Sequence, residues 1–376
     1  PAPVPVDLPL LDAAGFDADG NRVFMAAWVP SERWVLDDHR TRAGDALLPG
    51  TGYLELAAEA LAGQGEDQPF EITDLWFLRP LNTPDGAATQ IRLTLPRSDR
   101  GYTMTVEAGT GRGWNVTAEA AISLLPLTPP EPMDIAAIEA RMGPPIRAQE
   151  GALTSPQEGH LRFGPNWRVL RETRLGDGEG LARLSVDTPR DMGLHPGLMD
   201  LATGWAMDLI AGYDGSALWV PVNYASVKVF KPLPGDVISH VRNAGSNEAS
   251  AQTASFDITL AAPDGTTQEI GNSPAILHAC VAVQSSADRL CHLHLRVCDQ
   301  DLALGYCEAD TVGLCLGLER TREVRPFTVT QDLIFFLAHD RAIAAHTIIV
   351  RSRWLGRGCL DTSLAPIDRQ AVRNLV

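Results

Sequence analysis

One arrangement occurs twice along this chain: an apolar helix followed by several segments in which apolar and polar residues alternate. The run LLPGTGYLELAAEAL predicts a helix from about Gly50 to Leu61, and LHPGLMDLATGWAMDLI at 194–210 predicts a second one. Strand-like segments follow each helix, beginning with EITDLWFLRPL after the first and VPVNYASVKVF after the second. A sheet wrapped around a central helix, occurring twice, accounts for this order. We therefore expect an α+β chain built from two similar halves.

The boundary between the halves lies in the proline-rich stretch LTPPEPMD, which carries no period and is typical of a surface connection. We expect an N-terminal half over residues 1–130 and a C-terminal half over residues 131–279. Residues 280–376 differ in character, because they gain cysteine and histidine and lose regular alternation. This C-terminal extension is either a small extra module or the product of a shifted reading frame in a GC-rich gene.

Charge and composition exclude several classes of function. The formal net charge of −16 argues against a nucleic-acid groove or a basic membrane-binding face, because phosphate binding needs concentrated Lys and Arg. No apolar stretch of membrane-spanning length lacks charges, so we expect no membrane span. All six cysteines lie at or after Cys280 and form no CxxC pair, which fits the cytoplasm and predicts no metal site. The chain opens PAPVPV without a methionine or a signal peptide, which indicates a piece of a longer polypeptide.

Two side chains beside the predicted helices carry the chemistry. His39 stands just ahead of the glycine- and proline-punctuated turn before the first helix, and Asp200 lies among apolar residues of the second. A neutral histidine is the usual base near physiological pH, and a carboxyl group in an apolar pocket stays protonated and acts as an acid. One base and one acid suggest elimination or addition of water on an acyl chain. Without further motifs, His39 would be a solvated surface imidazole, and Asp200 a helix N-terminal residue favoured by the dipole.

Four segments together carry a family resemblance: DDHRTRAGDALLPGTGYLELA in the first half, and HLRFGPNW, LHPGLMD and VPVNYASVKVF in the second. Over about residues 5–275 the chain resembles the dehydratase domains of modular polyketide synthases, which have a double hot-dog fold. The resemblance implies two antiparallel sheets, each wrapped around a central helix. It also implies a hydro-lyase of the 3-hydroxyacyl-[acyl-carrier-protein] dehydratase type, which removes water from a β-hydroxyacyl thioester to give an α,β-unsaturated thioester. The substrate rides on the phosphopantetheine arm of an acyl carrier protein, and no other cofactor or metal is implied.

The same resemblance assigns roles to individual residues. His39 removes the α-proton and Asp200 protonates the departing hydroxyl group, while the developing enolate oxygen is held by backbone N–H groups, among them the Gly44 amide. His195 is expected to hold the loop that positions Asp200. Gly204 occupies the position, four residues after Asp200, from which the family supports the acid. The residues expected around the substrate and its thioester oxygen are Gly44, Pro49, Phe163, Gly164 and Pro165.

Three positions depart from the family's pattern. Four residues rather than three separate His39 from Gly44, and the extra residue should bulge the turn and re-aim the imidazole, where a shift of about 1 Å can cost on the order of 100-fold in rate. Phe163 replaces a tyrosine, so a hydroxyl group that would bond the substrate is missing. Gly204 replaces a glutamine or histidine that orients the acid, so the carboxyl group loses a supporting partner.

Two alternatives stay open beside the dehydratase. The first is a domain of the same fold that shifts a double bond or guides cyclisation in the manner of a product-template domain. The second is a catalytically silent, dehydratase-like spacer or docking domain. The partners implied are the acyl carrier protein, the neighbouring domains of a polyketide synthase, and a second copy of the chain in a homodimer. An arginine patch that includes Arg92, Arg97 and Arg100 is a candidate surface for docking the acidic carrier protein.

Overall fold

The computed structural model describes residues 2–187, 192–251, 253–265 and 267–280, and beyond these only the strands between 293 and 365. Side chains are described up to residue 265. The chain divides into two compact units, residues 1–282 and 283–376. The second unit contributes three small antiparallel sheets, formed by β20 (Leu293–Val297) with β21 (Gln300–Leu304), β22 (Gly313–Leu314) with β23 (Phe327–Thr328), and β24 (Asp332–Leu337) with β25 (His346–Leu355) and β26 (Cys359–Ala365). The two interpretations of residues 280–376, and the cysteine side chains, lie outside the described residues.

In the first half of the larger unit, an antiparallel sheet runs in the order β1-β2-β3-β8-β10-β11-β6, and β9 pairs with β10. Its helix α2 (Gly50–Ala62) agrees with the predicted helix and is buried on nearly all sides. The other elements are β1 (Val4–Pro5), β2 (Ala13–Phe16), β3 (Arg22–Trp28), η1 (Pro30–Glu32), α1 (Trp34–Asp37), β4 (His39–Thr41), β5 (Ala46–Leu47), β6 (Phe70–Phe77), β7 (Asn82–Thr83), β8 (Thr89–Leu95), β9 (Arg97–Ser98), β10 (Gly101–Thr110) and β11 (Gly113–Ser123).

The second half has the matching sheet order β16-β19-β18-β17-β15-β14-β12 around helix α4 (Pro196–Gly204). This helix is shorter than the apolar run at 194–210 predicts, because the chain continues after Gly204 into the separate turn η4 (Met207–Leu209). The other elements are α3 (Ile135–Glu139), β12 (Ile146–Arg147), η2 (Pro156–Gly159), β13 (Leu161–Phe163), η3 (Pro165–Trp167), β14 (Leu170–Leu175), β15 (Glu179–Ser185), β16 (Leu218–Val229), β17 (Asp236–Asn243), η5 (Ala249–Ala251), β18 (Thr253–Ala261) and β19 (Thr267–Cys280).

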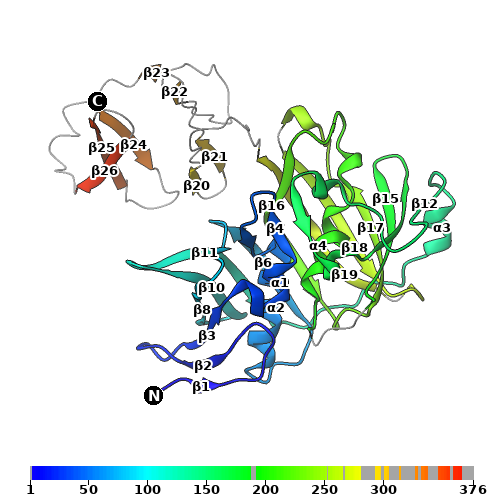
Figure 1. Ribbon diagram of the computed structural model, residues 1–376, viewed down its shortest axis with the longest axis horizontal. Coiled ribbons are helices and arrows are strands. Elements are labelled where there is room, and N and C mark those ends of the chain that lie inside the picture. Colours follow the sequence, from blue (N-terminus) through cyan, green and yellow to red (C-terminus); the bar gives the residue numbers. More distant parts are fainter. Residues whose placement is uncertain are drawn as a thin grey trace. The chain divides into compact units, whose positions relative to one another are not determined.

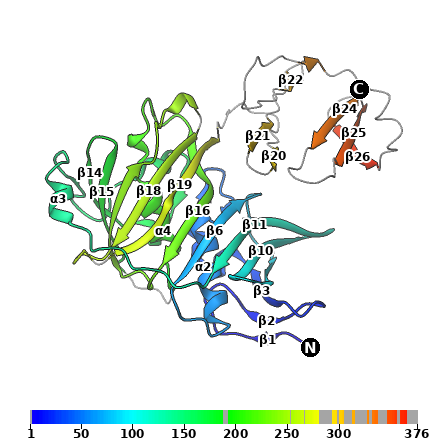
Figure 2. The ribbon, with the colours of Figure 1, turned by 180° about the vertical axis from the view of Figure 1, so that it is seen from behind.

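The two halves share one continuous sheet. In each half the strand that follows the helix, β6 or β16, lies at the inner edge, and these two strands pair antiparallel with Trp76 opposite Asn223. Figures 1 and 2 show β6 and β16 side by side, with α2 and α4 on the same face of the joined sheet. The expected two wrapped sheets are therefore present but fused edge to edge, which leaves neither inner edge strand unpaired.

Contact between the helices brings the two halves' polar residues together. The Thr51 hydroxyl group near the start of α2 donates to the Pro196 carbonyl oxygen at the start of α4, over 2.9 Å. Gly52 permits this tight entry into α2, because a Cβ atom there would lie 2.6 Å from the Leu48 side chain. Both helices thus begin at the same place in the molecule. Within the described residues no helix has the length and hydropathy needed to cross a bilayer.

A small second sheet ties the halves together at the predicted histidine. Its strand order is β13-β4-β5-β7, so β4 of the first half pairs with β13 of the second. In this register Phe163 lies directly opposite His39. Alternating apolar segments could not reveal this sheet, because its strands are only two or three residues long.

Candidate active site

His39 is the first residue of β4, and its ring is buried and fixed in one orientation. Its Nδ1 atom lies 2.7 Å from the Leu47 carbonyl oxygen, which can only accept a hydrogen bond. Nδ1 therefore carries the proton in the neutral ring, and Nε2 is left with its lone pair free to accept one. Nε2 faces Asp200 of α4, at 3.8 Å from Oδ2. The two residues that the sequence singles out, 161 positions apart, thus lie side by side.

The extra residue of the histidine motif is accommodated in the turn between β4 and β5. Thr41 accepts a bond from the Gly44 N–H and donates its own N–H to Asp45, and Gly44 takes the left-handed φ of +104° that this turn requires. The turn lies between His39 and its anchor, Leu47, so the insertion lengthens the loop without displacing the bond that orients the ring. The imidazole keeps its aim at Asp200.

The position of Gly44 does not fit the role expected of it. Its N–H donates to the Thr41 carbonyl oxygen over 3.0 Å, and its own carbonyl oxygen accepts from the Arg40 guanidinium over 2.7 Å. An amide already bonded within a turn is not available to an enolate oxygen. Pro49 caps α2 and has no N–H, and the Gly52 N–H donates to the Pro49 carbonyl oxygen, so the N–H groups of Gly50 and Thr51 at the start of α2 are the remaining candidates.

Asp200 is the fifth residue of α4 rather than its first, and its side chain is almost completely buried. Its Oδ2 atom accepts a hydrogen bond of 2.8 Å from the Trp167 indole N–H. Burial raises the pKa of Asp200 well above its ordinary value, while His39 and the Trp167 hydrogen bond act in the opposite direction. The pocket therefore favours the protonated carboxylic acid, and the indole N–H is placed to stabilise the carboxylate formed when the proton leaves.

Aromatic rings enclose the pair. Phe163 stacks on the His39 ring at a centroid distance of 5.6 Å, and Trp167 lies 5.4 Å from the same ring. Phe163 and Trp167 stack on each other at 5.9 Å. The position that the family fills with a tyrosine therefore still packs against the base through its ring, without a hydroxyl group.

The loop that carries these rings is held by the residue preceding the histidine. The Asp38 carboxylate accepts from the main-chain N–H of Asn166 over 3.0 Å and from its side-chain amide over 2.5 Å, and the Asp38 carbonyl oxygen accepts from the Gly164 N–H. A Cβ atom on Gly164 would lie 1.9 Å from the Asp38 carboxyl oxygen, so only glycine fits. Gly164 and Pro165 thus act through the loop backbone, and sequence reasoning missed the contact of Asp38 with this loop.

The loop before Asp200 is held by α2 of the other half. The buried Glu55 carboxylate accepts the main-chain N–H groups of Gly193 over 2.9 Å and Leu194 over 2.6 Å. His195 then adopts a left-handed φ of +37°, and its Nδ1 accepts from the Leu198 N–H, which caps α4. The cap fits the supporting role expected of His195. Glu55 was missed from the sequence, although a carboxylate in an otherwise apolar helix was a signal that could have pointed to it.

We expect Glu55→Gln to lower dehydration by roughly 10- to 100-fold, because displacing the loop moves Asp200 relative to His39 and a shift of about 1 Å is enough for such a loss. The glutamine amide replaces one acceptor with a donor that faces a backbone N–H, which costs about 1–3 kcal/mol in stability. The measurements are kcat on a β-hydroxyacyl thioester and the melting temperature. Glu59→Gln is the matched control, since Glu59 lies one turn further along α2 and bonds Leu10 of its own half. Equal losses of kcat in both variants would contradict a specific role for Glu55.

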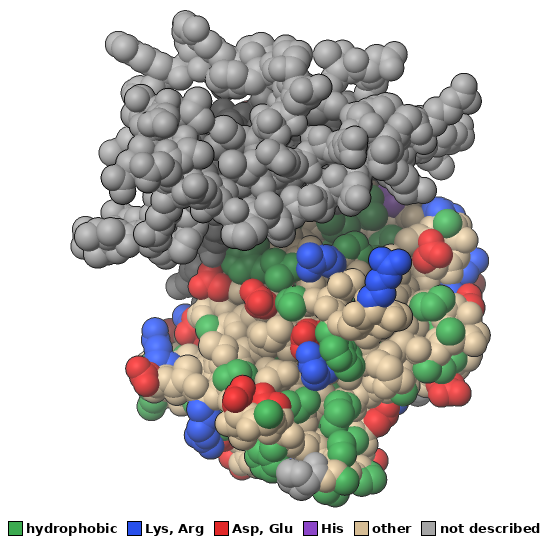
Figure 3. All heavy atoms as spheres, turned by 90° about the vertical axis from the view of Figure 1, so that its left-hand side faces the viewer, with side chains coloured by type: hydrophobic (Ala, Val, Ile, Leu, Met, Phe, Trp, Pro, Cys, Tyr) green, Lys and Arg blue, Asp and Glu red, His purple; other side chains and the backbone are tan. Residues whose placement is uncertain are grey.

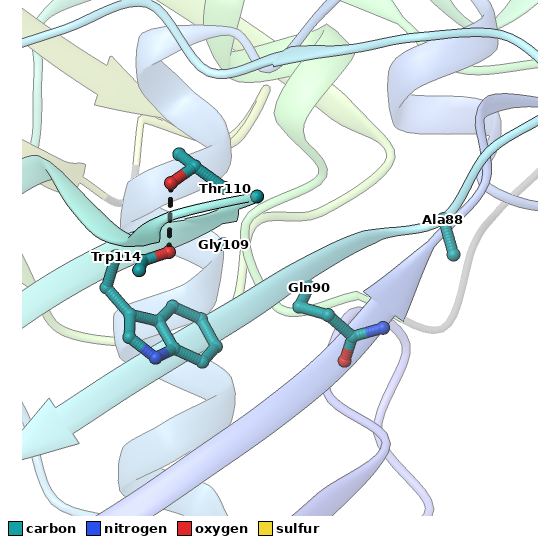
Figure 4. Close-up of a pocket in the computed structure, with 7 residues that line it drawn as sticks. Ala88, Gln90, Gly109, Thr110 and Trp114 are labelled. Atoms are coloured by element: carbon teal, nitrogen blue, oxygen red, sulfur yellow. Dashed lines mark hydrogen bonds between the residues drawn. The ribbon is translucent and has the colours of Figure 1, made fainter.

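Other candidate sites in the described part of the chain carry little chemistry. A pocket of about 390 Å³ lies beside the hairpin of β10 and β11, lined by residues such as Gln90, Thr110 and Trp114, and none of its lining side chains is titratable (Figure 4). Residues up to 265, outside the gaps named above, hold no cluster of three or more potential metal ligands.

Two families match the chain in sequence. Residues 9–109 match the family described as polyketide synthase dehydratase domain, and residues 130–269 match polyketide synthase dehydratase N-terminal domain. Polyketide synthase ThaG of Burkholderia thailandensis is 29% identical over 254 residues, which is 63% of this chain and 4% of ThaG. Polyketide synthase PksM of Bacillus subtilis is 24% identical over 253 residues, 62% of this chain and 6% of PksM. The chain thus spans a small fraction of these relatives, which are much longer proteins.

Solved dehydratase structures share the fold. The CurJ dehydratase of the curacin polyketide synthase, solved as an inactive histidine-to-phenylalanine variant, superposes with a TM-score of 0.64 at 17% identity, covering 72% of this chain and 96% of that one. The CurK dehydratase, solved as an inactive aspartate-to-asparagine variant, gives a TM-score of 0.61 at 19% identity over 72% of this chain and 98% of that one. With two adjoining family matches over more than half of its residues and the double hot-dog fold, this chain belongs to the polyketide synthase dehydratase domain family.

Proposed function

We propose that this chain removes water from a β-hydroxyacyl thioester carried by an acyl carrier protein and yields the α,β-unsaturated thioester. The observation that carries the proposal is the 3.8 Å separation between His39 Nε2 and Asp200 Oδ2, in a buried pocket where the ring tautomer and the carboxyl protonation both suit the reaction. Base and acid of the required kinds meet at one place. This supports an active enzyme over a silent spacer domain.

The proton transfers follow from the hydrogen bonds of each residue. His39 Nε2 takes the α-proton, and the electron pair of that C–H bond forms the new carbon–carbon double bond as the β-hydroxyl group departs. Asp200 gives its proton to the hydroxyl oxygen, which leaves as water. The imidazolium is stabilised by the Leu47 carbonyl oxygen, and the carboxylate by the Trp167 N–H. Return of the proton from His39 to Asp200 restores the starting state.

The closeness of the pair constrains the stereochemistry. Since the base and the acid lie only 3.8 Å apart, they reach the α-proton and the β-hydroxyl group from the same side of the acyl chain. This favours a syn elimination. We assign stabilisation of the negative charge that develops on the thioester oxygen to the first N–H groups of α2, which begins at Gly50. This end of α2 is bonded to the start of α4 through Thr51 and Pro196.

The carrier protein and its phosphopantetheine arm belong to the same proposal, as does assembly into a cytoplasmic, dimeric synthase. The predicted arginine patch is partly engaged, because Arg92 bonds Glu107 over 2.7 Å and lies over the Trp114 ring, while Arg97 lies over Tyr102. Figure 3 shows one face of the molecule, on which basic side chains are scattered among acidic ones. Docking through this patch would require Arg92 to exchange an intramolecular partner for the carrier.

The test is direct. The purified chain is incubated with a β-hydroxyacyl pantetheine thioester, and the acyl product is followed by mass spectrometry. Loss of one water with formation of the conjugated thioester is the expected result. Conversion of an α,β-unsaturated thioester to its β,γ isomer, without water loss from the hydroxyacyl substrate, would favour the double-bond isomerase. No conversion of either substrate would favour the silent domain.

A further inference from the structure

Gly204 leaves a space on the face of α4 that carries the acid. Asp200 and Gly204 are four residues apart in α4, so they lie on the same side of the helix, one turn from each other. The missing side chain is not replaced by empty space. A Cβ atom built on Gly204 would lie 2.7 Å from Nε2 of Gln157, 3.2 Å from its Cδ and 3.3 Å from its Oε1. The Gln157 amide therefore covers the place where a side chain at 204 would start.

Gln157 comes from η2, a different element, and is held there firmly. The turn begins with a capping box in which Ser155 and Glu158 each bond the other's backbone N–H. The Ser155 hydroxyl group also donates to Oε1 of Gln157 over 3.3 Å, and Gln157 is only 7% exposed. Because the amide oxygen is bonded on the Ser155 side, the amide nitrogen points toward Gly204.

The N–H groups of the Gln157 amide are available to a ligand. Among the described residues no group accepts a hydrogen bond from Gln157 Nε2, and this atom is not fully buried, so a ligand or water can pair with it. Cβ atoms four residues apart on a helix lie about 5–6 Å from each other. The Gln157 amide at the 204 position thus lies about one helical turn from Asp200, on the same side of α4.

We propose that the Gln157 side-chain amide binds the β-hydroxyl oxygen of the substrate and positions it for Asp200. Gln157 can reach this place from η2 because Gly204 has no side chain. This inference rests on the proposed dehydratase function. It assigns a substrate-binding residue from outside the motifs that carry His39 and Asp200. It also gives a reason for glycine at 204, since any larger residue would push the amide aside.

The first experiment measures binding without turnover. In a His39→Phe background, which keeps Asp200 and Gln157, the affinities for a β-hydroxyacyl pantetheine thioester and for its saturated analogue without the hydroxyl group are compared. Adding Gln157→Ala should weaken binding of the hydroxyacyl compound by about five- to tenfold, the worth of one hydrogen bond, and leave the saturated analogue unchanged. Equal weakening of both compounds, or of neither, would overturn the proposal.

The second experiment exchanges the two positions. In the otherwise wild-type chain, Gln157→Ala and Gly204→Gln alone should each lower kcat/KM about tenfold, the first by removing the amide and the second by displacing it. The double variant should recover most of the loss, because the glutamine at 204 then occupies the vacated space. Gln64→Ala, which removes an amide near the far end of α2, is the control and should leave kcat/KM unchanged. A double variant no better than the singles would overturn the proposal.

Different results would overturn the proposed function and the role of Gln157. If the wild-type chain does not dehydrate the hydroxyacyl thioester, the proposed function falls, and the role of Gln157 falls with it. If the wild-type chain is active and Gln157→Ala matches it in kcat/KM, only the role of Gln157 is overturned.

Discussion

Replacing His39 with phenylalanine should lower kcat for dehydration by about 10⁴-fold, the upper end of what a positioned general base contributes. Phenylalanine keeps an aromatic ring against Phe163 and Trp167, so the packing survives, while the nitrogen that takes the α-proton is lost. The measurement is single-turnover conversion of a β-hydroxyacyl pantetheine thioester. Binding of that thioester should change little, because the substrate's hydroxyl group and acyl chain meet other residues.

His160→Phe is the matched control for this variant. The His160 ring contacts the Gly215 carbonyl oxygen rather than the catalytic pair, and its substitution keeps the backbone N–H that caps η2, so kcat should stay within about twofold of the wild type. A His39→Phe chain that retained a tenth or more of the wild-type rate would remove His39 from the mechanism.

Replacing Asp200 with asparagine should lower kcat by about 10³-fold, since the amide cannot donate the proton that the leaving hydroxyl group needs. The same change should raise the melting temperature near neutral pH. A buried carboxyl group with a raised pKa binds its proton more tightly in the folded than in the unfolded chain. Stability is therefore lost as pH rises above the unfolded pKa toward the folded one, and asparagine, which does not ionise, avoids that loss.

The pH dependence of this difference gives the check. The melting temperatures of Asp200→Asn and wild type should converge at a pH below the ordinary carboxyl pKa, where Asp200 is protonated in both the folded and unfolded chain, and diverge as pH rises. In the wild type, kcat should fall as pH rises through the raised pKa of Asp200, because the acid is then ionised. A gap in melting temperature that stayed constant with pH would contradict the assignment of a protonated Asp200.

Local patterns in the sequence were enough for most of the architecture. Period-two segments predicted strands β6 and β16 to within about four residues at each end, and the apolar run after Pro49 predicted α2 to within one, since those patterns reflect which face of each element is buried. The second helix was predicted too long, because the apolar run continues through η4 after the helix itself has ended. The short strands β4, β5 and β13 were not predicted, because two or three residues carry no measurable period.

The candidate site divides in a similar way. The sequence motifs singled out His39 and Asp200, whose side chains lie 3.8 Å apart, while the expected use of the Gly44 amide does not fit its bond within the turn. Glu55 escaped notice because its partners are backbone N–H groups 138 and 139 residues away. Contacts of that kind leave no pattern in a single sequence.

By itself, the sequence determined which residues are chemically able to act: a histidine able to serve as base, an aspartate among apolar neighbours, and two helices with strands to bury them. Only the tertiary structure decided the ring tautomer of His39, the distance to Asp200, and the filling of the Gly204 space by Gln157. The physical reason is the separation along the chain of the residues involved. Helix and strand periodicity arises from residues close along the chain, whereas proton transfer depends on atoms brought within a few ångströms by the pairing of β6 with β16 and of β4 with β13.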